Sequence, residues 1–280
     1  MHLIQAILMG IVQGLSEFLP ISSSAHLVFT SNFYKIFANV PIQDQSGQEI
    51  FFDIMVHLGT LIAVMIFFRK DICSIIKSFF RACTTKNWRE PEAQLGLFII
   101  IGTLITVLIA FPINKFAAFM VYKPELVGAF LLITAIILFY SEHMSKNYKD
   151  KNKKIDFKTA VLIGLAQGLA AIPGFSRSGW TIATGLFCGL DRITAARYSF
   201  LLSIPIILGA SMIYPFVEID LKEVVNYNWY AIITGTIVSG IVGYLCIKYF
   251  MKFLSKFSMK VFGYYCLIMG IFAIVFFTMD

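Results

Sequence analysis

The sequence predicts an all-α polytopic membrane protein made of two related halves with inverted topology. The first observation behind this prediction is composition: 58% of the 280 residues are hydrophobic and 14% are charged, and the mean hydropathy is +0.79. Soluble globular domains carry about 25% charged residues. The second observation is a set of long, nearly charge-free stretches, and the third is an internal duplication.

Six stretches are apolar and long enough to be read as membrane-spanning helices, which need about 20 residues. They cover about 51–68, 95–113, 124–140, 197–216, 229–247 and 261–278. The N-terminus has no basic region of the kind that opens a signal peptide.

The duplication relates residues 6–26 to residues 160–180 without a gap. Eight of the 21 aligned pairs are identical at a constant offset of 154. The first copy carries Glu17, Ser23 and His26, and the second carries Arg177 in the position of Ser23. One copy therefore holds acid and base groups and the other holds a cation, as expected for two half-sites that meet.

The distribution of cations predicts the topology. Six Lys and Arg residues fall in 69–94, six in 141–158, two at Arg192 and Arg197, and four in 248–260. Basic connections belong in the cytoplasm. All of these basic connections fall on the same side of the membrane only if the duplicated segments do not cross it. The net charge of +7 is then a topology signal, and no nucleic-acid partner is expected.

Each half is therefore predicted to be one re-entrant helical hairpin followed by three spans. The hairpins cover about 1–30 and 158–190, in a first repeat of 1–145 and an inverted second repeat of 146–280. Pro20 and three successive serines interrupt the first hairpin, and Pro173-Gly174 interrupts the second. Broken backbone is tolerated inside a membrane where protein or a water-filled cavity satisfies it. Such turns leading into helices aim N–H groups at one point, which favours phosphate.

Gln13 and Glu17 are four residues apart and share one helix face. A carboxylate inside a membrane is costly unless it has a function or a partner. Its oxygens, with the Gln13 carbonyl and the oxygens of a substrate phosphate, suit Mg²⁺ or Ca²⁺. The alternative for Glu17 is an interfacial residue facing water.

Ser23 and His26 are spaced to share a helix face, so a nucleophile and its base are one interpretation. A packed histidine is the alternative. Arg177, between Ser176 and Ser178, suits bidentate phosphate recognition. An intramembrane ion pair with Glu17 is the other interpretation of Arg177, and the two are compatible.

Two other polar residues and one small-residue segment are interpreted structurally. His57 lies near the start of a span and is expected to be a packed histidine, with access to a cavity as the alternative. Asp53 is expected at the interface. Small residues in 235–243 (GTIVSGIVG) could let helices approach closely. They would serve a homodimer or internal packing equally well.

The stretches QGLSEFLPISSSAH at 13–26 and PGFSRSGWT at 173–181 resemble the two signatures of the undecaprenyl-diphosphate phosphatase family, associated with bacitracin resistance. The resemblance covers essentially the whole chain. It implies an integral membrane enzyme that removes the terminal phosphate from the C55 isoprenyl diphosphate carrier used in cell-wall synthesis. It also implies a bacterial plasma-membrane location among membrane lipids.

The resemblance assigns roles to individual residues. Glu17, Ser23, His26 and Arg177 match catalytic positions, and Gln13 with Glu17 matches the element linked to the divalent ion. The substrate phosphate is expected to contact Ser22, Ser24, Ser176, Arg177, Ser178 and Thr181. Some members carry Glu where this chain has Gln13, and Ala25 stands where Gly is common.

The resulting mechanism has Ser23 attack phosphorus with His26 as base, while Arg177 and the hydroxyl-rich turns hold the phosphate. A direct His26 nucleophile is the main alternative. The site is expected to open to the external side, because the Glu17 hairpin enters from there. Two other functions fit parts of the pattern: a secondary transporter or lipid flippase, and a non-catalytic lipid-diphosphate receptor.

Overall fold

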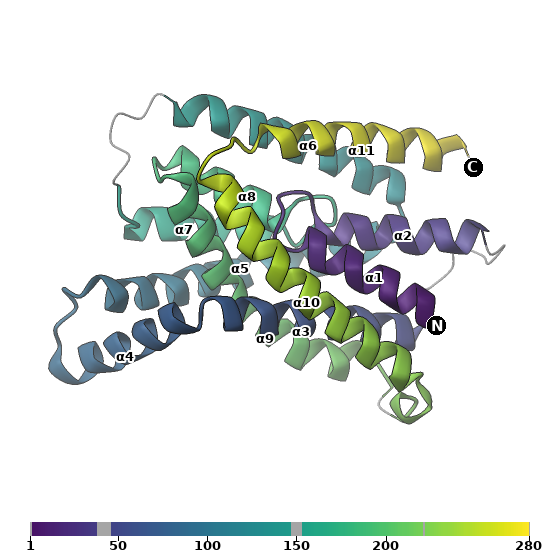
Figure 1. The fold of residues 1–280 in the computed structure, drawn as a ribbon, viewed down its shortest axis with the longest axis horizontal. Helices are drawn as coiled ribbons and strands as arrows, with labels where there is room; N and C mark the ends of the chain where they lie inside the picture. Colours follow the sequence, from purple (N-terminus) through teal and green to yellow (C-terminus); the bar gives the residue numbers. More distant parts are fainter. Residues whose placement is uncertain (1, 38–45, 147–152, 221, 280) are drawn as a thin grey trace.

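The computed structural model is all-helical throughout the residues that it describes, which are 2–37, 46–146, 153–220 and 222–279. Eleven α-helices and one short 3-10 helix form there (Figure 1). They are α1 (Leu3–Ser16), α2 (Ser23–Phe37), α3 (Gly47–Phe67), α4 (Arg69–Thr85), α5 (Pro91–Met120), α6 (Pro124–Ser145), α7 (Phe157–Leu169), α8 (Arg177–Phe187), α9 (Arg192–Glu218), η1 (Val224–Asn226), α10 (Trp229–Leu254) and α11 (Lys260–Met279).

Six of these helices are long and apolar enough to cross a membrane, and they confirm the predicted polytopic fold. They are α3, α5, α6, α9, α10 and α11. Each contains its predicted span to within one residue at either end, and most extend further. Two extensions at helix starts have a local cause. Pro91 stands in the first turn of α5, where proline is tolerated, and Ser46 begins α3 with a capping box. Pro124 likewise stands in the first turn of α6, which begins where it was predicted to begin.

The basic segment 69–94 contains a helix that the hydropathy pattern did not indicate. Helix α4 is amphipathic, and only Ile75 and Ala82 of its side chains are fully buried. It packs against α5, and an ion pair between Arg197 and Asp71 ties it to α9. Part of the second basic segment, 141–158, lies outside the described residues, including Lys149 and Lys151.

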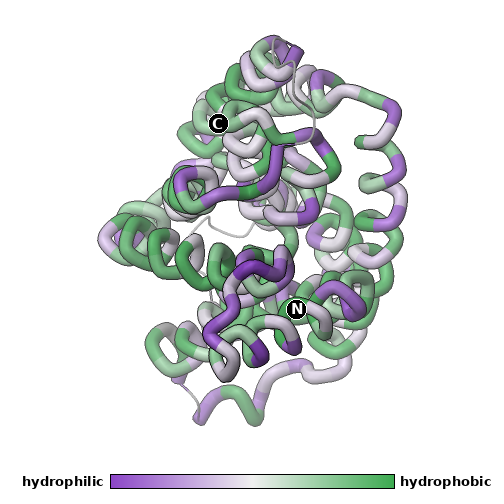
Figure 2. The backbone as a smooth tube through the Cα atoms, turned by 90° about the vertical axis from the view of Figure 1, so that its left-hand side faces the viewer, coloured by the Kyte–Doolittle hydropathy of each residue, from purple (hydrophilic) through white to green (hydrophobic). Residues whose placement is uncertain are grey.

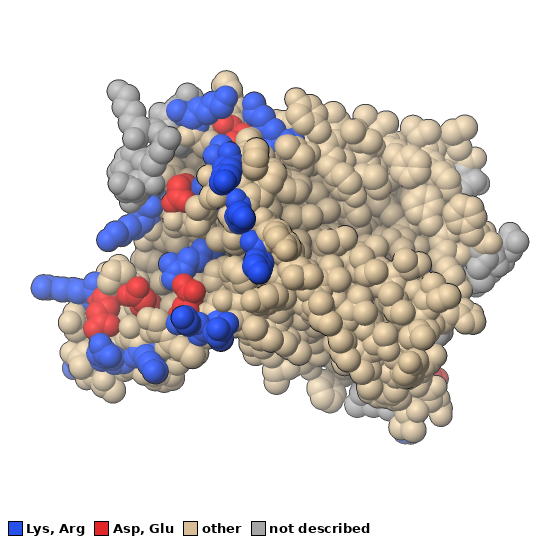
Figure 3. All heavy atoms as spheres, in the orientation of Figure 1, with Lys and Arg blue, Asp and Glu red and all other residues tan. Residues whose placement is uncertain are grey.

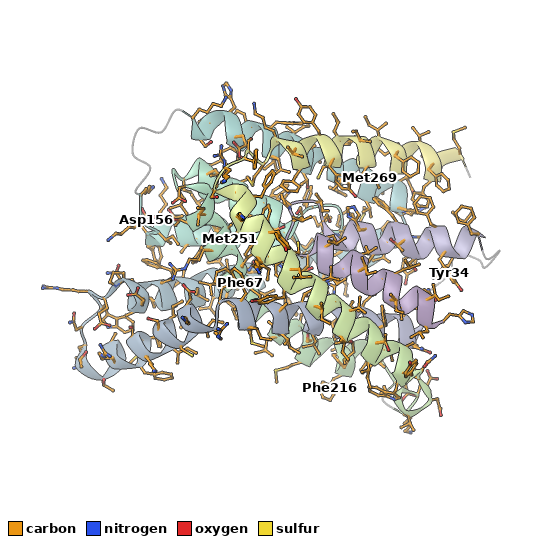
Figure 4. All side chains as sticks on the ribbon, viewed as in Figure 1. Tyr34, Phe67, Asp156, Phe216, Met251 and Met269 are labelled. Carbon is orange, nitrogen blue, oxygen red and sulfur yellow. The ribbon has the colours of Figure 1, made fainter. Side chains whose placement is uncertain are left out.

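The two broken-helix segments form hairpins that open toward opposite ends of the molecule. Helices α1 and α2 enclose the turn 17–22, and α7 and α8 enclose the turn 170–176. Tyr34, near the end of α2, lies at the end of the molecule opposite Asp156, which precedes α7 (Figure 4). The two turns therefore approach each other in the interior of the molecule.

Each hairpin packs against the other half of the chain in the same way. Helix α1 packs along α10, and α7 packs along α5. A Cβ atom added at Gly10 would lie 2.6 Å from the Gly235 carbonyl oxygen, and one at Gly164 would lie 2.7 Å from the Gly102 carbonyl oxygen. Glycines at equivalent positions of the duplication thus make equivalent close contacts, which supports the predicted repeat.

The charged side chains gather at one end of the face shown in Figure 3, over α4 and the connection between α10 and α11, while the rest of that face is almost free of charge. Hydrophobic residues dominate the helices, and hydrophilic stretches occur mainly where helices are joined (Figure 2). The positive-inside rule predicts that this basic end faces the cytoplasm.

The small residues of 235–243 pack inside the chain. Gly235 lies against Phe52 and the α1 backbone, and the Ser239 hydroxyl donates to the Val56 carbonyl at 2.8 Å. Internal packing therefore accounts for these small residues, and the homodimer stays a prediction.

Candidate functional site

Glu17 lies at the centre of a polar cluster where the two hairpin turns meet. Its carboxylate is 5% exposed. Oε2 accepts hydrogen bonds from the Ser23 hydroxyl at 2.6 Å and from the Gln13 amide at 2.9 Å. Oε1 accepts from Arg177, and this ion pair joins the first hairpin to the second. The structure thus brings four of the predicted site residues into one buried network.

Arg177 has hydrogen-bonding capacity left over after it pairs with Glu17. Its side chain is 17% exposed, and its Nη1 is fully buried with no hydrogen-bond partner among the described residues. Buried donors in native proteins nearly always have a partner, and an unpaired one costs about 1–3 kcal/mol or more. Nη1 is therefore a donor available to an anion that enters the site.

The turn of the second hairpin is held by Thr134 of α6, which is fully buried. The Thr134 hydroxyl donates to the Gly174 carbonyl at 3.0 Å, and it accepts from the Ser176 amide and the Trp180 indole, both at 3.3 Å. Gly174 has a φ of +96°, which glycine adopts without strain. Ser176 caps α8 by accepting from the Gly179 amide. These contacts place Arg177 at the start of α8.

The turn of the first hairpin uses its serines in a similar way. Ser22 has a φ of +70°, and its carbonyl accepts from the backbone amide of His26. Its hydroxyl lies 3.2 Å from that of Ser24, as the Ser176 hydroxyl lies 3.4 Å from that of Ser178. Helix α2 begins at Ser23 and α8 begins at Arg177, each between the two serines of its turn, so the positive ends of two helix dipoles point into the same region.

The two hairpin turns also contact each other directly. The Ser178 hydroxyl donates to the Leu19 carbonyl at 2.8 Å. Thr181, which was expected to bind phosphate, is fully buried, and its hydroxyl bonds the Arg177 carbonyl and the Ser199 hydroxyl instead. The hydrogen bond from the Thr181 hydroxyl to the Arg177 carbonyl helps to hold Arg177 in place.

His26 does not contact Ser23 through a hydrogen bond in the described structure. Its Nδ1 lies 2.8 Å from the Ser22 carbonyl, and its Nε2 lies 2.7 Å from the Tyr265 hydroxyl of α11. A carbonyl oxygen only accepts, so Nδ1 carries the proton and Nε2 accepts from tyrosine in the neutral ring. The expected Ser23–His26 pairing is therefore replaced by a Ser23–Glu17 pairing.

His57, which was expected to be a packed histidine, is the histidine that lies beside the carboxylate. Its Nε2 is 3.7 Å from Glu17 Oε2, and its Nδ1 is 2.7 Å from the Asp53 carbonyl. One carboxylate oxygen of Asp53 is also fully buried, with no partner among the described residues. An acidic residue four positions before His57 on one helix face is the signal that could have indicated this polar face.

Gln13 and Glu17 fit a divalent cation in part. Gln13 is fully buried, and its Oε1 has no hydrogen-bond partner among the described residues, so one hard oxygen stands free beside the carboxylate. Mg²⁺ is commonly held by one or two carboxylates together with substrate phosphates and water. The described residues contain no group of three or more His, Cys, Asp or Glu side chains that could hold a metal by themselves. The donor set thus suits an ion that also binds the substrate's phosphate oxygens.

The arrangement combines a hydroxyl on a carboxylate, a cation with a free donor, and two helix N-termini. Comparison with known proteins gives these features a family. The family model of Bacitracin resistance protein BacA matches residues 6–272. The chain belongs to this family.

Relatives match over almost the full length of both chains. An undecaprenyl-diphosphatase of Methanosphaera stadtmanae is 41% identical, with 98% of each chain covered. One from Halothermothrix orenii is 39% identical, again with 98% of each chain covered. Undecaprenyl-diphosphatase 1 of Pseudoalteromonas translucida is 36% identical over 100% of both chains.

Proposed function

We propose that this protein hydrolyses undecaprenyl diphosphate to undecaprenyl phosphate and inorganic phosphate, which recycles the lipid carrier and confers bacitracin resistance. The names of its relatives support this substrate. The observation that carries the proposal is the buried Arg177 Nη1, a free donor beside the Ser23–Glu17 pair. A nucleophile, a proton acceptor and a hydrogen-bond donor that can bind phosphate converge there.

In the first step, the Ser23 oxygen attacks the terminal phosphorus, and the P–O bond to the lipid phosphate breaks. The Ser23 proton passes to Glu17, whose Oε2 already accepts the hydroxyl hydrogen bond at 2.6 Å. Arg177 and the N–H groups at the starts of α2 and α8 stabilise the charge on the phosphoryl oxygens, which supplies most of the catalysis in phosphoryl transfer. The products are a phosphoserine and the lipid monophosphate.

In the second step, water attacks the phosphorus and the bond to the Ser23 oxygen breaks. The Ser23 oxygen takes back the proton held by Glu17, and inorganic phosphate leaves with the proton that the water loses. His26 is the alternative nucleophile. The Tyr265 hydroxyl occupies its Nε2, the nitrogen that would attack, so the geometry favours Ser23. Gln13 and Glu17 would hold the divalent ion, which when bound neutralises charge on the phosphate oxygens.

We propose that the site opens to the external side of the plasma membrane. Glu49, Asp53 and His57 follow one another at four-residue spacing on one face of α3 and lead from its first turn toward Glu17. Glu49 also pairs with Lys35 of α2 at 3.6 Å. The start of α3 lies away from the basic end, so this polar face provides a route for water and phosphate from outside.

The inverted repeat is part of the same proposal. Hairpins that open to opposite ends and glycines with equivalent contacts support two halves that each contribute one turn to a shared site. A transporter or flippase would share that architecture. The Ser23–Glu17 hydrogen bond distinguishes the two functions, because transit of an anion needs no nucleophile.

Phosphate release by purified protein in detergent tests the proposal, since no membrane remains to be crossed. The wild type should release phosphate from undecaprenyl diphosphate. Ser23→Ala should lower the rate at least about 100-fold, because the attacking oxygen is gone, in line with the effects of single catalytic groups. His143→Gln, an exposed change near the end of α6, is the control and should match the wild type. No release by the wild type, or equal release by Ser23→Ala, would contradict the proposal.

A further inference from the structure

The imidazole of His57 and the carboxylate of Glu17 face each other at a distance too long for a hydrogen bond. His57 Nε2 and Glu17 Oε2 are 3.7 Å apart, whereas a hydrogen bond from nitrogen to oxygen spans about 2.9 Å. His57 Nδ1 lies 2.7 Å from the Asp53 carbonyl oxygen. That oxygen only accepts, so Nδ1 carries the proton of the neutral ring, and Nε2 presents a lone pair to the carboxylate.

Two acceptor atoms that face each other in a buried site are favourable only when a positive group lies between them. The Glu17 side chain is 5% exposed and the His57 side chain is 30% exposed. Arg177 does not fill this role, because it bonds Oε1, the other oxygen of the carboxylate. A cation held between His57 Nε2 and Glu17 Oε2 would satisfy both atoms, as buried polar groups in proteins require.

The separation of the two atoms suits a metal ion. Two ligands of one ion, each bonded at about 2.1 Å, lie about 3.0–4.2 Å apart as the angle between the bonds opens from a right angle to a straight line. The 3.7 Å between His57 Nε2 and Glu17 Oε2 falls within this range. Gln13 donates to Oε2 at 2.9 Å through its amide nitrogen. Its buried Oε1 has no hydrogen-bond partner among the described residues, so Gln13 can supply a third ligand.

The surroundings of His57 are those of a histidine that binds a metal. A hydrogen bond from the other ring nitrogen to a backbone carbonyl fixes the tautomer and orients the ring of such ligands. The helix that carries His57 is also held closely. A Cβ atom at Gly59 would lie 2.3 Å from the Thr236 carbonyl oxygen of α10, and the Ser239 hydroxyl donates to the Val56 carbonyl at 2.8 Å. The ring is therefore positioned before an ion binds.

We propose that His57 is a ligand of the divalent ion, together with Glu17 and Gln13, and that the site prefers a first-row transition-metal ion such as Mn²⁺ to Mg²⁺ or Ca²⁺. This inference rests on the ion site of the proposed function. Transition-metal ions bind imidazole nitrogen well, whereas Mg²⁺ and Ca²⁺ take oxygen ligands. Mn²⁺ also accepts carboxylate oxygens, so it suits both kinds of ligand in this site.

Pulsed electron paramagnetic resonance of bound Mn²⁺ tests the proposal without any turnover. The protein is purified in detergent, freed of metal with a chelator and loaded with Mn²⁺ alone. The wild type should show coupling between Mn²⁺ and a directly bonded nitrogen nucleus. His57→Gln replaces the imidazole with an amide that offers oxygen, so the nitrogen coupling should disappear. His57→Asn makes the same test if His57→Gln does not fold.

His26→Gln is the matched control. It makes the same exchange at the histidine whose ring nitrogens lie against the Ser22 carbonyl and the Tyr265 hydroxyl. Because neither nitrogen of His26 faces Glu17, this variant should keep the nitrogen coupling of the wild type.

Competition between ions gives a second measurement. Ca²⁺ is added to the protein loaded with Mn²⁺, and released Mn²⁺ is followed by the signal of the free ion. His57→Gln should weaken Mn²⁺ binding about tenfold or more, since even residues that only orient a metal ligand contribute about 10- to 100-fold in affinity. Ca²⁺ binding should change less than about threefold, because glutamine offers the oxygen that Ca²⁺ prefers.

The proposal is overturned if the wild type shows no nitrogen coupling, or if the coupling survives in His57→Gln or is lost in His26→Gln. It is also overturned if His57→Gln weakens Mn²⁺ and Ca²⁺ binding equally. Failure of the proposed function gives a different result. Nitrogen-coupled Mn²⁺ would then be present, but the wild type would release no phosphate from undecaprenyl diphosphate.

Discussion

Replacing Arg177 by alanine should destabilise the protein more than any change to its exposed ion pairs. Glu17 is 5% exposed and the Arg177 side chain 17%, so removal of the guanidinium leaves an uncompensated buried carboxylate. Such losses cost about 3–5 kcal/mol. The hydrogen bonds from Ser23 and Gln13 remain, which places the expected value near the lower end, about 3 kcal/mol.

The exposed Arg197–Asp71 pair is the internal comparison. Its side chains are 41% and 30% exposed, and exposed pairs contribute about 0–1 kcal/mol. Arg197→Ala should therefore change stability by less than about 1 kcal/mol. Denaturant unfolding in detergent, followed by circular dichroism, measures both.

The double variant Glu17→Ala with Arg177→Ala separates charge from packing. It removes the buried carboxylate together with its partner and should regain much of the stability lost in Arg177→Ala, while phosphate release stays absent. The reasoning is refuted if Arg177→Ala is no less stable than Arg197→Ala, or if the double variant is as unstable as Arg177→Ala.

Three further predictions concern the hairpins. Gly10→Ala places a Cβ 2.6 Å from the Gly235 carbonyl oxygen and should cost about 1–3 kcal/mol, whereas Gly209→Ala, with nothing within 4 Å of its Cβ, should not destabilise; equal unfolding midpoints would contradict this packing. Thr134→Val removes the Thr134 hydroxyl that holds the second hairpin turn, and should lower the free energy of unfolding by about 1–3 kcal/mol and reduce phosphate release. Wild-type activity in this variant would show that the turn does not depend on the Thr134 hydroxyl. Asp156 caps α7, and hydrogen bonds from the side chain and amide of the third residue of α7 hold its pKa below the ordinary value. Asp156→Ala should therefore lower the free energy of unfolding by about 0.5–2 kcal/mol at neutral pH. The difference from wild type should vanish as pH falls through the lowered pKa of Asp156, because a protonated carboxyl no longer acts as the cap. A difference that does not change with pH would show that the Asp156 carboxylate is not the cap.

The spans were predictable because the bilayer demands long apolar helices, and the hairpins because Gly, Pro and Ser interrupt them. The amphipathic helix α4 was not predicted, because its sequence is charged and the bilayer's demand for long apolar helices does not apply to it. It forms on its contact with α5.

The site was predictable where the duplication or the signatures mark it, as at Glu17, Ser23 and Arg177. Partners from other helices were not, since Thr134 and Tyr265 lie in ordinary apolar stretches and meet the hairpins only in three dimensions. His57 carries a helical-spacing signal, but only the fold turns its ring toward Glu17.

The nucleophile provides the most direct test of the central claim, that the Ser23–Glu17 pair at the meeting hairpins performs phosphoryl transfer. Purified protein is mixed briefly with undecaprenyl diphosphate radiolabelled in its terminal phosphate, quenched in acid for one sample and alkali for another, and digested. Phosphoserine survives acid and phosphohistidine survives alkali, so both candidates are detected. The account predicts acid-stable label on the peptide containing Ser23, absent from Ser23→Ala. Label on His26, or full turnover with no covalent label, would contradict it.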